Sequence, residues 1–503
     1  MLSFSRVPLY SCRSRAGATA LNASEMRING ALGQQWTRTM AVSQGGKRQR
    51  LARPRGTMDV VGPECLDHAL VEREGRSVAS ICGFEEIRTP IFEFTDLFAR
   101  SLGDGSDVVS KEMYTFADRS DNSLTLRPEG TAGVCRAALS RKDAETVQRL
   151  FYYGPMFRYE RPQHGRQRQF TQLGVELLGS QGPSADVDVI EFASLFLERL
   201  GLWGQASGLE TRLLINSLGD PESRELYHAK LSAHLEKFRG SLSEDSERRV
   251  EQGRYLRVLD SKDEADMEAV NSAPHLQDSL TDSARQRFDQ VKESLEIIGI
   301  DYEVDPLLVR GLDYYTHTIF EFVVPSHAAQ RPSAILAGGR YDGLSTTLGF
   351  KDNVPGIGWA AGVERLVLER ARLGIPAGGA NTTPMLFLAP IAMSESDHPE
   401  LVNRRVREIA SQLRRATPGM VVQTWLDGLD SPTGTRSAMR KAFRAAERAK
   451  ADFVGFVGAE EAKAGPFNLT VKHLQSGNQE SVSSMASLLE FCNIEHRPTP
   501  TPP

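Results

Sequence analysis

The sequence predicts an α+β protein in which strand-rich regions surround a helical segment and a small α/β domain follows. Residues 151–179 hold two apolar runs around a polar centre, which indicates two antiparallel strands joined by a loop. Residues 220–300 are strongly charged, and their apolar residues have helical spacing. From residue 384 strands and helices alternate, which is typical of a partly parallel sheet.

The loop of the strand pair gives the first sign of a function. Four arginines, Arg158, Arg161, Arg166 and Arg168, crowd between strands that anchor in a core. Because like charges repel one another, such a cluster needs an anionic partner, and phosphate is the obvious candidate. A solvated hairpin tip would carry the same residues, so both interpretations stay open at this point.

Composition limits the class of protein. The chain of 503 residues is too long for one hydrophobic core, and typical domain sizes suggest roughly three domains. A net charge of -5 at pH 7 excludes a protein that coats nucleic acid through an overall basic surface. Five scattered cysteines without a C-x-x-C pair argue against a disulfide framework and a cysteine zinc site. No apolar run is long enough to span a membrane, so we expect a soluble protein.

Residues 1–52 form a basic segment. They carry eight lysines and arginines against a single acid, Glu25. This composition is typical of an organellar transit peptide, which predicts a mitochondrial or other organellar location, and equally of a disordered arm. Met40 could begin a shorter product without most of the basic segment, so a cytoplasmic form is a second expectation.

The first predicted element is a helix that begins near Pro63 and is ended by Gly83. Its expected core positions are Leu66, Leu70 and Val78. Short strands are predicted next, over residues 86–92. Pro90 lies inside that run and lacks a backbone donor, so it indicates a sheet edge or a bend, which is often a subunit contact. A plain structural edge strand is the alternative.

Residues 113–116 and 123–126 are predicted to pair as a hairpin, and residues 127–131 lead from it into a helix. Thr131 is the expected N-cap. The free N–H groups at the start of this helix favour an anion nearby. Glu129 is open to two interpretations, a structural capping carboxylate or a group that binds a ligand.

Residues 185–200 form the next predicted helix, and residues 210–215 a strand. The charged segment that follows separates two strand-rich regions, so we interpret it as an inserted helical domain. Asp220 and Pro221 provide its first N-cap and first-turn residue. The apolar stripe of its first helix is Leu226, Leu231, Leu235 and Phe238.

Strand character returns at residues 306–324. Residues 335–349 are predicted to form a glycine-rich turn, and residues 354–373 a strand or turn followed by a helix. The run Gly356-x-Gly358-x-x-x-Gly362 lacks the spacing of a dinucleotide fingerprint, and the chain contains no P-loop. Any nucleotide must be bound by another device.

A linker rich in Gly, Pro and Thr over residues 373–384 precedes the final domain. The predicted elements of that domain are strand 385–389, helix 399–416, strand 421–426, helix 435–450, strand 453–457 and strand 468–474. The second helix carries six lysines and arginines, a face that suits an RNA backbone as well as solvent. The tail from Arg497 is expected to be disordered.

Six stretches occur in the order and at the spacing of a known enzyme family. Besides the first strand pair they are GFEEIRTPIFE, TLRPEGTAG, LVRGLDYYTHTIFEF, AGGRYDGL and GIGWAAGVERLVL. Together they resemble class II aminoacyl-tRNA synthetases, and specifically histidyl-tRNA synthetases of the bacterial type, over residues 55–492. The blocks LVRGLDYY and AGGRYDG carry the resemblance to the histidine-specific members. The stretch GRYLRVLDSK departs from the family pattern, which often has Asn-Pro before the leucine.

The resemblance implies a domain plan. The family fold is an antiparallel sheet flanked by helices, in a homodimer joined through the first motif, which places Pro90 at the contact. The insertion is implied to clasp the tRNA acceptor arm. The implied boundaries are 1–52 for the basic segment, 53–215 and 305–378 for the catalytic core, 216–304 for the insertion, 384–492 for an anticodon-binding domain and 493–503 for the tail.

The resemblance also implies a reaction, in which L-histidine and ATP with Mg²⁺ form histidyl-adenylate and histidine then passes to tRNA(His). Family roles in histidine binding carry over to Glu129, Thr131, Gln172, Glu176, Tyr314, Tyr315 and Tyr341, with Glu176 and Tyr315 resembling the pair that binds the imidazole. The positions for ATP are Arg158, Phe170 and Arg365, and those for tRNA are Arg161 and Gln163. Arg310 and Arg158 resemble the catalytic arginines.

Those residue types suit the chemistry, because arginines offset the repulsion between a carboxylate and a phosphate. A pocket of buried polar groups would reject apolar side chains. A regulatory relative that binds histidine or tRNA without activating the amino acid is the main alternative. Such a protein would be expected to lose the phosphate-binding arginines or the final domain, and this chain keeps both. A stand-alone RNA-binding protein fits poorly with the overall negative charge.

Overall fold

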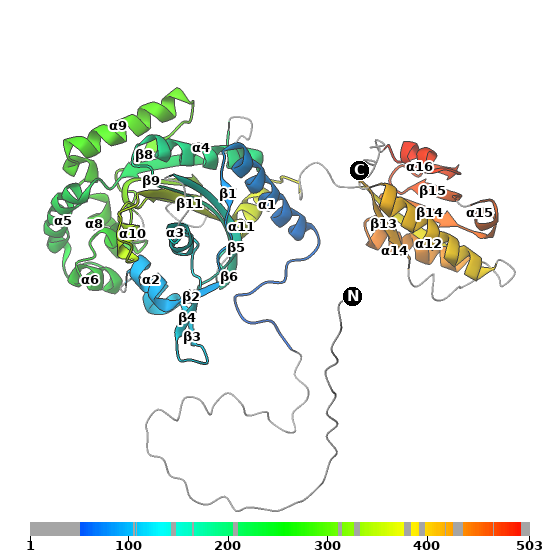
Figure 1. The fold of residues 1–503 in the computed structure, drawn as a ribbon, viewed down its shortest axis with the longest axis horizontal. Coiled ribbons are helices and arrows are strands. Elements are labelled where there is room, and N and C mark those ends of the chain that lie inside the picture. The colour runs from blue at the N-terminus through cyan, green and yellow to red at the C-terminus, as the bar shows by residue number, and fades with distance from the viewer. Residues whose placement is uncertain are drawn as a thin grey trace, which may run out of the picture. The chain divides into compact units, whose positions relative to one another are not determined.

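The strand pair predicted at residues 151–179 lies within the largest sheet of the structure (Figure 1). Strands β5 (Gln148–Phe157) and β6 (Gln169–Leu178) pair antiparallel along their whole lengths, which confirms the prediction. In this pairing Tyr152 lies opposite Gly174, and Leu150 lies opposite Glu176.

The structure is a computed structural model. It describes residues 51–103, 106, 108–141, 147–162, 165–204, 210–309, 314–325, 332–376, 384–391, 398–417, 419–425, 436–465 and 467–493. The predictions for residues 1–50, for most of the linker and for the tail therefore lie outside the described residues, as do Gln163 and Arg310.

The large sheet has eight strands among the described residues, in the order β1-β5-β6-β11-β10-β9-β7-β8. The remaining strands are β1 (Glu85–Glu86), β7 (Arg212–Ser217), β8 (Glu303–Val304), β9 (Thr316–Val324), β10 (Ser333–Arg340) and β11 (Gly356–Gly362). The six central strands are antiparallel, and the short edge strands β1 and β8 each pair in parallel. This is the α+β arrangement that the sequence predicts.

Alternate side chains of β5 pack into the hydrophobic cores on opposite faces of the sheet, because successive side chains of a strand point to opposite faces. Phe151 packs into the core under helices α1 (Pro63–Ile81), α4 (Ser184–Arg199) and α11 (Val363–Arg372). Leu150 and Tyr152 pack on the other face, beside α3 (Thr131–Leu139). Figure 1 shows α3 across the sheet from α1 and α4.

The inserted segment is helical, as predicted. Its helices are α5 (Pro221–Leu235), α6 (Glu244–Glu251), α7 (Leu256–Leu259), α8 (Met267–Asn271) and α9 (Asp282–Ile297). Asp220 is the N-cap of α5, since its carboxylate accepts the backbone N–H of Ser223 at 2.8 Å. The predicted apolar stripe of α5 is only partly right, because Leu231 and Leu235 are buried whereas Leu226 is exposed. Leu66 on α1 is also exposed, so its assignment to the core was wrong.

The run predicted as short strands around Pro90 forms two short strands, and the bend that Pro90 indicated is confirmed. The exposed Pro90 lies in the connection between β1 and β2 (Phe92–Phe94), and these strands belong to different sheets. A residue without an N–H cannot continue a ladder, and the chain uses it to change sheets. Strand β2 pairs with β4 (Ser123–Leu126), which pairs with β3 (Tyr114–Ala117), so the predicted hairpin is confirmed. Helix α2 (Thr95–Leu102) follows β2.

The predicted glycine-rich turn over residues 335–349 is only partly right, because its first half is strand β10 and the turn comes after it. A Cβ atom at Gly338 would overlap the carbonyl oxygen of Gly358 and the backbone of Trp359 on β11. Glycine is therefore needed for the close approach of two strands and not for a turn. The chain turns only after Arg340, ahead of the short helix α10 (Leu344–Thr347).

The C-terminal domain has the predicted alternation. Its elements are β12 (Met385–Pro390), α12 (Pro399–Ala416), β13 (Val421–Thr424), α14 (Arg436–Arg448), β14 (Phe453–Val457), α15 (Ala459–Lys463), β15 (Leu469–His473), β16 (Gln479–Val482) and α16 (Met485–Phe491). Strand β12 is parallel to both β13 and β14, while β15 and β16 are antiparallel. The sequence interpretation missed α15, β16 and α16. Across the described part of the chain, no helix has the length and apolar character needed to cross a membrane.

Candidate active site

A cavity of about 1300 Å³ lies over strands β6, β10 and β11, beside the start of α3. The predicted site residues that line it are Glu129, Thr131, Arg158, Phe170, Gln172, Glu176, Tyr314, Tyr315, Tyr341 and Arg365. Arg161 is exposed and is not part of this lining. Residues from five separate stretches of the sequence thus meet in one place.

Glu129 caps helix α3. Its carboxylate accepts the backbone N–H groups of Thr131 at 2.6 Å and Ala132 at 2.9 Å. Thr131 is the first helical residue and makes no cap, so its prediction as the N-cap is corrected. Burial raises the pKa of Glu129, and the two backbone donors partly offset that effect. Each carboxylate oxygen keeps acceptor capacity for a cation in the cavity.

Glu176 lies fully buried at the floor of the cavity. Thr131 Oγ1 donates to Glu176 Oε1 at 2.6 Å, and the Tyr341 hydroxyl donates to Glu176 Oε2. Burial raises the pKa of Glu176 to about 8. Gly358 lies opposite Glu176 on β11, and a Cβ atom there would overlap Glu176 Oε2. This side chain can therefore occupy its position only because the neighbouring strand carries glycine.

Three tyrosine rings form one wall of the cavity. The Tyr314 ring centroid lies 4.7 Å from that of Tyr315 and 5.8 Å from that of Tyr341. The hydroxyl bound to Glu176 is that of Tyr341, and the Tyr315 ring packs on Tyr314. The expected contact of Glu176 and Tyr315 with an imidazole stays a prediction. The result is a slot lined by tyrosine rings with the Glu176 carboxylate beside it, which suits a ring that carries N–H groups.

Guanidinium groups gather at the other end of the cavity. Arg158 Nε donates to the carbonyl oxygen of Pro128 at 2.8 Å, and its guanidinium carbon lies 5.3 Å from the Phe170 ring centroid. Arg365 Nη1 donates to the carbonyl oxygen of Ala334 at 3.0 Å. Burial lowers the pKa of Arg365, and the nearby charge of Arg166 lowers it further. Such a concentration of partly desolvated cations favours a polyanion.

Arg166 also lines the cavity, although the sequence interpretation gave it no separate role. It lies 3.5 Å from Glu160, which is itself 3.9 Å from Arg158. The signal that could have found it is its place in the basic loop, between Arg158 and Phe170.

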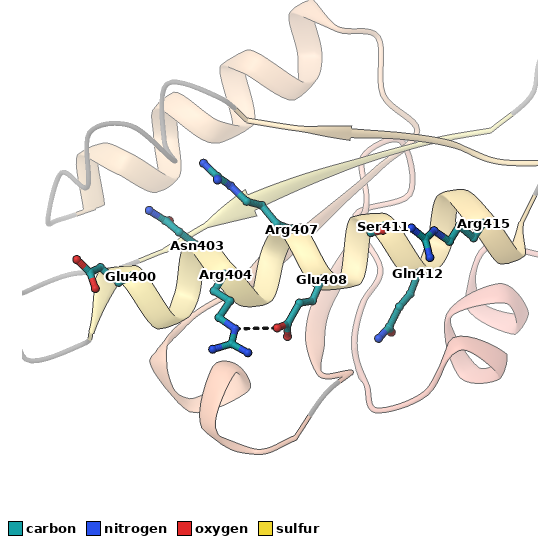
Figure 2. Close-up of a pocket in the computed structure, with 8 residues that line it drawn as sticks. All are labelled: Glu400, Asn403, Arg404, Arg407, Glu408, Ser411, Gln412 and Arg415. Atoms are coloured by element: carbon teal, nitrogen blue, oxygen red, sulfur yellow. Dashed lines mark hydrogen bonds and ion pairs between the residues drawn. The ribbon is translucent and has the colours of Figure 1, made fainter. Parts of the chain in front are cut away.

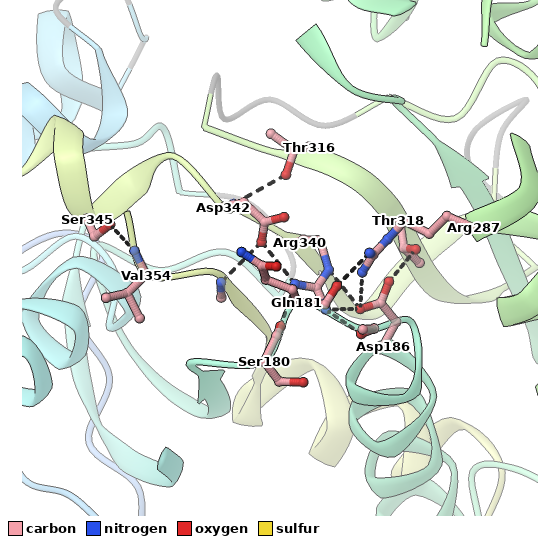
Figure 3. Close-up of polar contacts among 12 residues, drawn as sticks. Ser180, Gln181, Asp186, Arg287, Thr316, Thr318, Arg340, Asp342, Ser345 and Val354 are labelled. Atoms are coloured by element: carbon pink, nitrogen blue, oxygen red, sulfur yellow. Dashed lines mark hydrogen bonds and ion pairs between the residues drawn. The ribbon is translucent and has the colours of Figure 1, made fainter. Parts of the chain in front are cut away.

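A buried polar cluster behind the tyrosine wall was not predicted (Figure 3). Arg340 and Asp186 form an ion pair with both side chains fully buried, and Arg340 Nη1 also lies 2.9 Å from Asp342. Thr318 Oγ1 donates to Asp186 at 2.6 Å, and Arg287 of helix α9 lies 3.6 Å from the same carboxylate. Because Tyr341 follows Arg340 directly, this cluster fixes the backbone that presents the Tyr341 hydroxyl.

A second hollow lies along helix α12 of the C-terminal domain (Figure 2). Its lining residues are Glu400, Asn403, Arg404, Arg407, Glu408, Ser411, Gln412 and Arg415. Charges of both signs are present, and Arg404 pairs with Glu408 at 2.9 Å. All of the lining comes from one helix face, so we do not assign catalysis to it.

Comparison with known proteins decides between families that could build such a cavity. A sequence profile described as histidyl-tRNA synthetase matches residues 56–366, more than half of the chain. The chain belongs to the histidyl-tRNA synthetase family. The observed fold, a large sheet flanked by helices with a C-terminal α/β domain, is accordingly the α+β fold of a class II synthetase.

Individual relatives agree with this membership. The histidine–tRNA ligase of Rhodospirillum rubrum is 48% identical over 440 residues, which cover 87% of this chain and 97% of the relative. Apo histidyl-tRNA synthetase from S. aureus matches with a TM-score of 0.66 at 30% identity, over 88% of this chain and 99% of that chain. A Bacillus halodurans protein described as an ATP phosphoribosyltransferase regulatory subunit/histidyl-tRNA synthetase shares the fold, with a TM-score of 0.52 at 21% identity, over 78% and 97% of the two chains.

Proposed function

We infer that this chain is an ATP-dependent histidine–tRNA ligase, which forms histidyl-adenylate and pyrophosphate and then transfers histidine to the 3′ end of tRNA(His). The observation that carries this inference is the cavity, which joins the Glu176–Tyr341 slot to the Arg158 and Arg365 guanidinium groups. A ring-binding slot beside a polyanion site is what the activation of an amino acid requires.

The slot receives the histidine. Glu176 accepts an imidazole N–H with the acceptor capacity that Thr131 and Tyr341 leave, Tyr315 is proposed to hydrogen-bond the same imidazole, and Tyr314 and Tyr341 line the pocket. Glu129 and Gln172 receive the α-ammonium group from the start of α3 and from β6. A side chain without ring N–H groups would fill the slot without giving Glu176 the further donor that imidazole supplies, and is rejected for that reason.

The basic end of the cavity receives ATP. Arg158 binds the α-phosphate together with the histidine carboxylate, and Arg365 binds the γ-phosphate at the far end of the nucleotide. The Phe170 ring stacks on adenine. Attack of the carboxylate on the α-phosphorus brings two anions together, and these arginines offset the repulsion and stabilise the spreading charge. Arg310, which lies outside the described residues, is proposed to act on the same α-phosphate.

Magnesium fits this cavity as an ion that arrives with ATP. Among the residues that the structure describes, no group of three or more His, Cys, Asp or Glu side chains could hold a metal by itself. Magnesium is usually held by one or two carboxylates together with substrate phosphates, and Glu160, Glu321 and Glu364 line the cavity. When bound, the ion would neutralise charge on the phosphates.

Other parts of the chain are assigned to tRNA. The exposed Arg161 lies between β5 and β6 and is proposed to meet the tRNA end. Gln163, which lies outside the described residues, is proposed for the same role. Residues 216–304 would hold the acceptor arm, and residues 384–492 would read the anticodon. Helix α14 supports the latter role, because Arg440, Lys441, Arg444 and Arg448 are all exposed.

The small sheet supports a homodimer. Four large apolar side chains near the exposed Pro90 are themselves exposed, namely Ile91, Phe92, Phe94 and Phe116. Contiguous apolar residues of this kind on a sheet mark an interface, and a second copy of the chain is the proposed partner. Sedimentation of the purified protein would test this, with a monomer at micromolar concentration as the contradicting result.

The proposal keeps the remaining domain boundaries. The catalytic core is assigned to residues 53–215 and 305–378, and the tail to residues 493–503.

The segment 1–52 is proposed to direct the protein to mitochondria or another organelle, with a cytoplasmic form starting at Met40. Fractionation of cells that express the full-length and Met40-started forms separately would test this. An intact Met1 terminus on the organellar protein would contradict the removal of a transit peptide.

The whole reaction is tested by transfer of labelled histidine to a tRNA(His) transcript. Product should form only when ATP, histidine and transcript are all present. A folded protein that binds histidine but forms no histidyl-tRNA would favour the regulatory alternative. The cavity arginines argue against that outcome, since a protein that only senses histidine has no need of them.

A further inference from the structure

Tyr152 lies directly behind the histidine slot without reaching the cavity. It is a residue of strand β5 that is 5% exposed, and it does not line the cavity. Its ring fills the space left by two glycines, because a Cβ atom at Gly130 or at Gly174 would overlap it. Backbone from the start of α3 and from β6 therefore clamps this ring in one position.

The hydroxyl of Tyr152 is buried and makes no hydrogen bond at standard geometry within the described residues. A buried hydroxyl without a partner is costly, so such a group calls for an explanation. Burial raises the pKa of Tyr152 well above its ordinary value, and the negative charges of Glu176 and Glu129 raise it further. The hydroxyl oxygen lies against Gly130, where an added Cβ atom would be 2.8 Å from it, and is therefore next to Thr131. The Thr131 hydroxyl lowers the pKa of Tyr152, and the phenol in turn lowers the pKa of Glu176.

The Thr131 hydroxyl has a free acceptor site for the phenol of Tyr152. A threonine hydroxyl has one donor and two acceptor sites. The Thr131 donor is committed to Glu176 Oε1 at 2.6 Å, which leaves both acceptor sites available for donors. The phenol of Tyr152 can fill one of them, and an ammonium group in the cavity can fill the other.

We propose that Tyr152 is a positioning residue that donates to the Thr131 hydroxyl and so holds the Thr131 proton on Glu176. This inference rests on the proposed function, since it is histidine that uses Thr131 and Glu176. Because Tyr152 donates to the Thr131 oxygen, the Thr131 O–H cannot rotate away from Glu176. Glu176 therefore keeps the hydrogen-bond donor that stabilises its charged form. Tyr152 therefore acts on histidine binding and not on ATP.

The test is Tyr152→Phe, which removes one oxygen atom and keeps the clamped ring. The KM for histidine in ATP–pyrophosphate exchange should rise about tenfold, as expected for one lost hydrogen bond in a charged chain, while the KM for ATP stays within about twofold. Affinity for histidinol, which keeps the ammonium and imidazole groups but lacks the carboxylate, should fall by the same factor in calorimetry. This loss would locate the effect at the slot rather than at Arg158.

Tyr153→Phe is the matched control. Tyr153 is the next residue of β5, points to the other face of the sheet and packs against the core under α1, α4 and α11. It should leave the KM for histidine unchanged. An unchanged KM for histidine in Tyr152→Phe, or an equal rise in both KM values together with a lower melting temperature, would overturn the proposal.

A double-mutant cycle separates positioning from packing. In a Thr131→Val background the phenol has no hydroxyl to orient, so Tyr152→Phe should add no further loss of histidinol affinity. Additive losses would contradict the proposal. Because histidinol binding needs no catalysis, a wild-type protein that binds it without catalysing exchange would refute the ligase function and leave the Tyr152 comparison intact. A wild-type protein that binds neither histidine nor histidinol would overturn both.

Discussion

Asp186 at the start of helix α4 and Arg340 at the end of strand β10 form a fully buried ion pair between residues 154 positions apart. Arg340 Nε lies 2.8 Å from Asp186 Oδ1, and its Nη1 and Nη2 also donate to the carbonyl oxygens of Ser180 and Gly182. Helix α4, which covers one face of the sheet, is thus tied to the end of the strand that directly precedes the site residue Tyr341.

Arg340→Met should strongly destabilise the protein, because it leaves the Asp186 carboxylate buried without its main partner. We expect a loss of about 3–5 kcal/mol in the free energy of unfolding, measured by urea denaturation at pH 7. Arg404→Met is the control, since the Arg404–Glu408 pair is exposed and should contribute less than about 1 kcal/mol. Similar small losses for both variants would contradict the structural role of the buried pair.

Gly358→Ala should damage the histidine slot. The added Cβ atom would overlap Glu176 Oε2 and the carbonyl oxygen of Val175, so the carboxylate or the strand must move. Overpacking of this kind costs about 1–3 kcal/mol, and we expect at least a tenfold rise in the KM for histidine. Gly343→Ala, where nothing lies within 4 Å of the added atom, should match the wild type. Equal KM values for the two variants would show that Glu176 does not need the space.

The free protein should lose stability as pH rises through the neutral range because of Glu176. Burial raises its pKa to about 8, whereas an unfolded glutamate has a pKa of about 4.3. Between these values the folded protein holds a proton that the unfolded chain releases, so the stabilising effect present below about pH 4.3 is lost towards pH 8. In Glu176→Gln this titration is absent. Calorimetry from pH 5 to 8.5 should show a shallower fall in Tm for the variant, and parallel curves would contradict the raised pKa.

Arg365→Ala should weaken ATP binding selectively. Loss of a charge-assisted contact with phosphate predicts a rise of about 10- to 100-fold in the KM for ATP, with little change in the KM for histidine. Pyrophosphate exchange under saturation by the other substrate measures both constants. Arg161→Ala is a control from the same basic region, which should leave exchange intact and slow only the transfer to tRNA. A rise in the KM for histidine as large as that for ATP would refute the assignment.

Local signals predicted much of this structure. Pro63 begins α1, Asp220 caps α5, and the two apolar runs around Arg161 form a strand pair, because each depends on neighbours in sequence. The ten cavity residues came from a family resemblance that covers most of the chain.

Features that depend on long-range packing could not be predicted in the same way. The sequence alone suggested that Gly338 is a turn residue, whereas its glycine is needed for the close approach of β11. Nothing in the sequence pairs Arg340 with Asp186. Capping by Glu129 rather than Thr131 also depends on tertiary structure, since Thr131 is already the first helical residue and its hydroxyl points to Glu176 on a distant strand.

Histidine-dependent exchange of labelled pyrophosphate into ATP tests the central claim most directly, because it reports adenylate formation in this cavity without tRNA. The wild-type protein should exchange label with histidine and Mg²⁺ and with no other common amino acid, and chelation of Mg²⁺ should abolish the signal. Folded protein that binds histidine but gives no exchange would contradict the assignment of the cavity as the site of histidine activation.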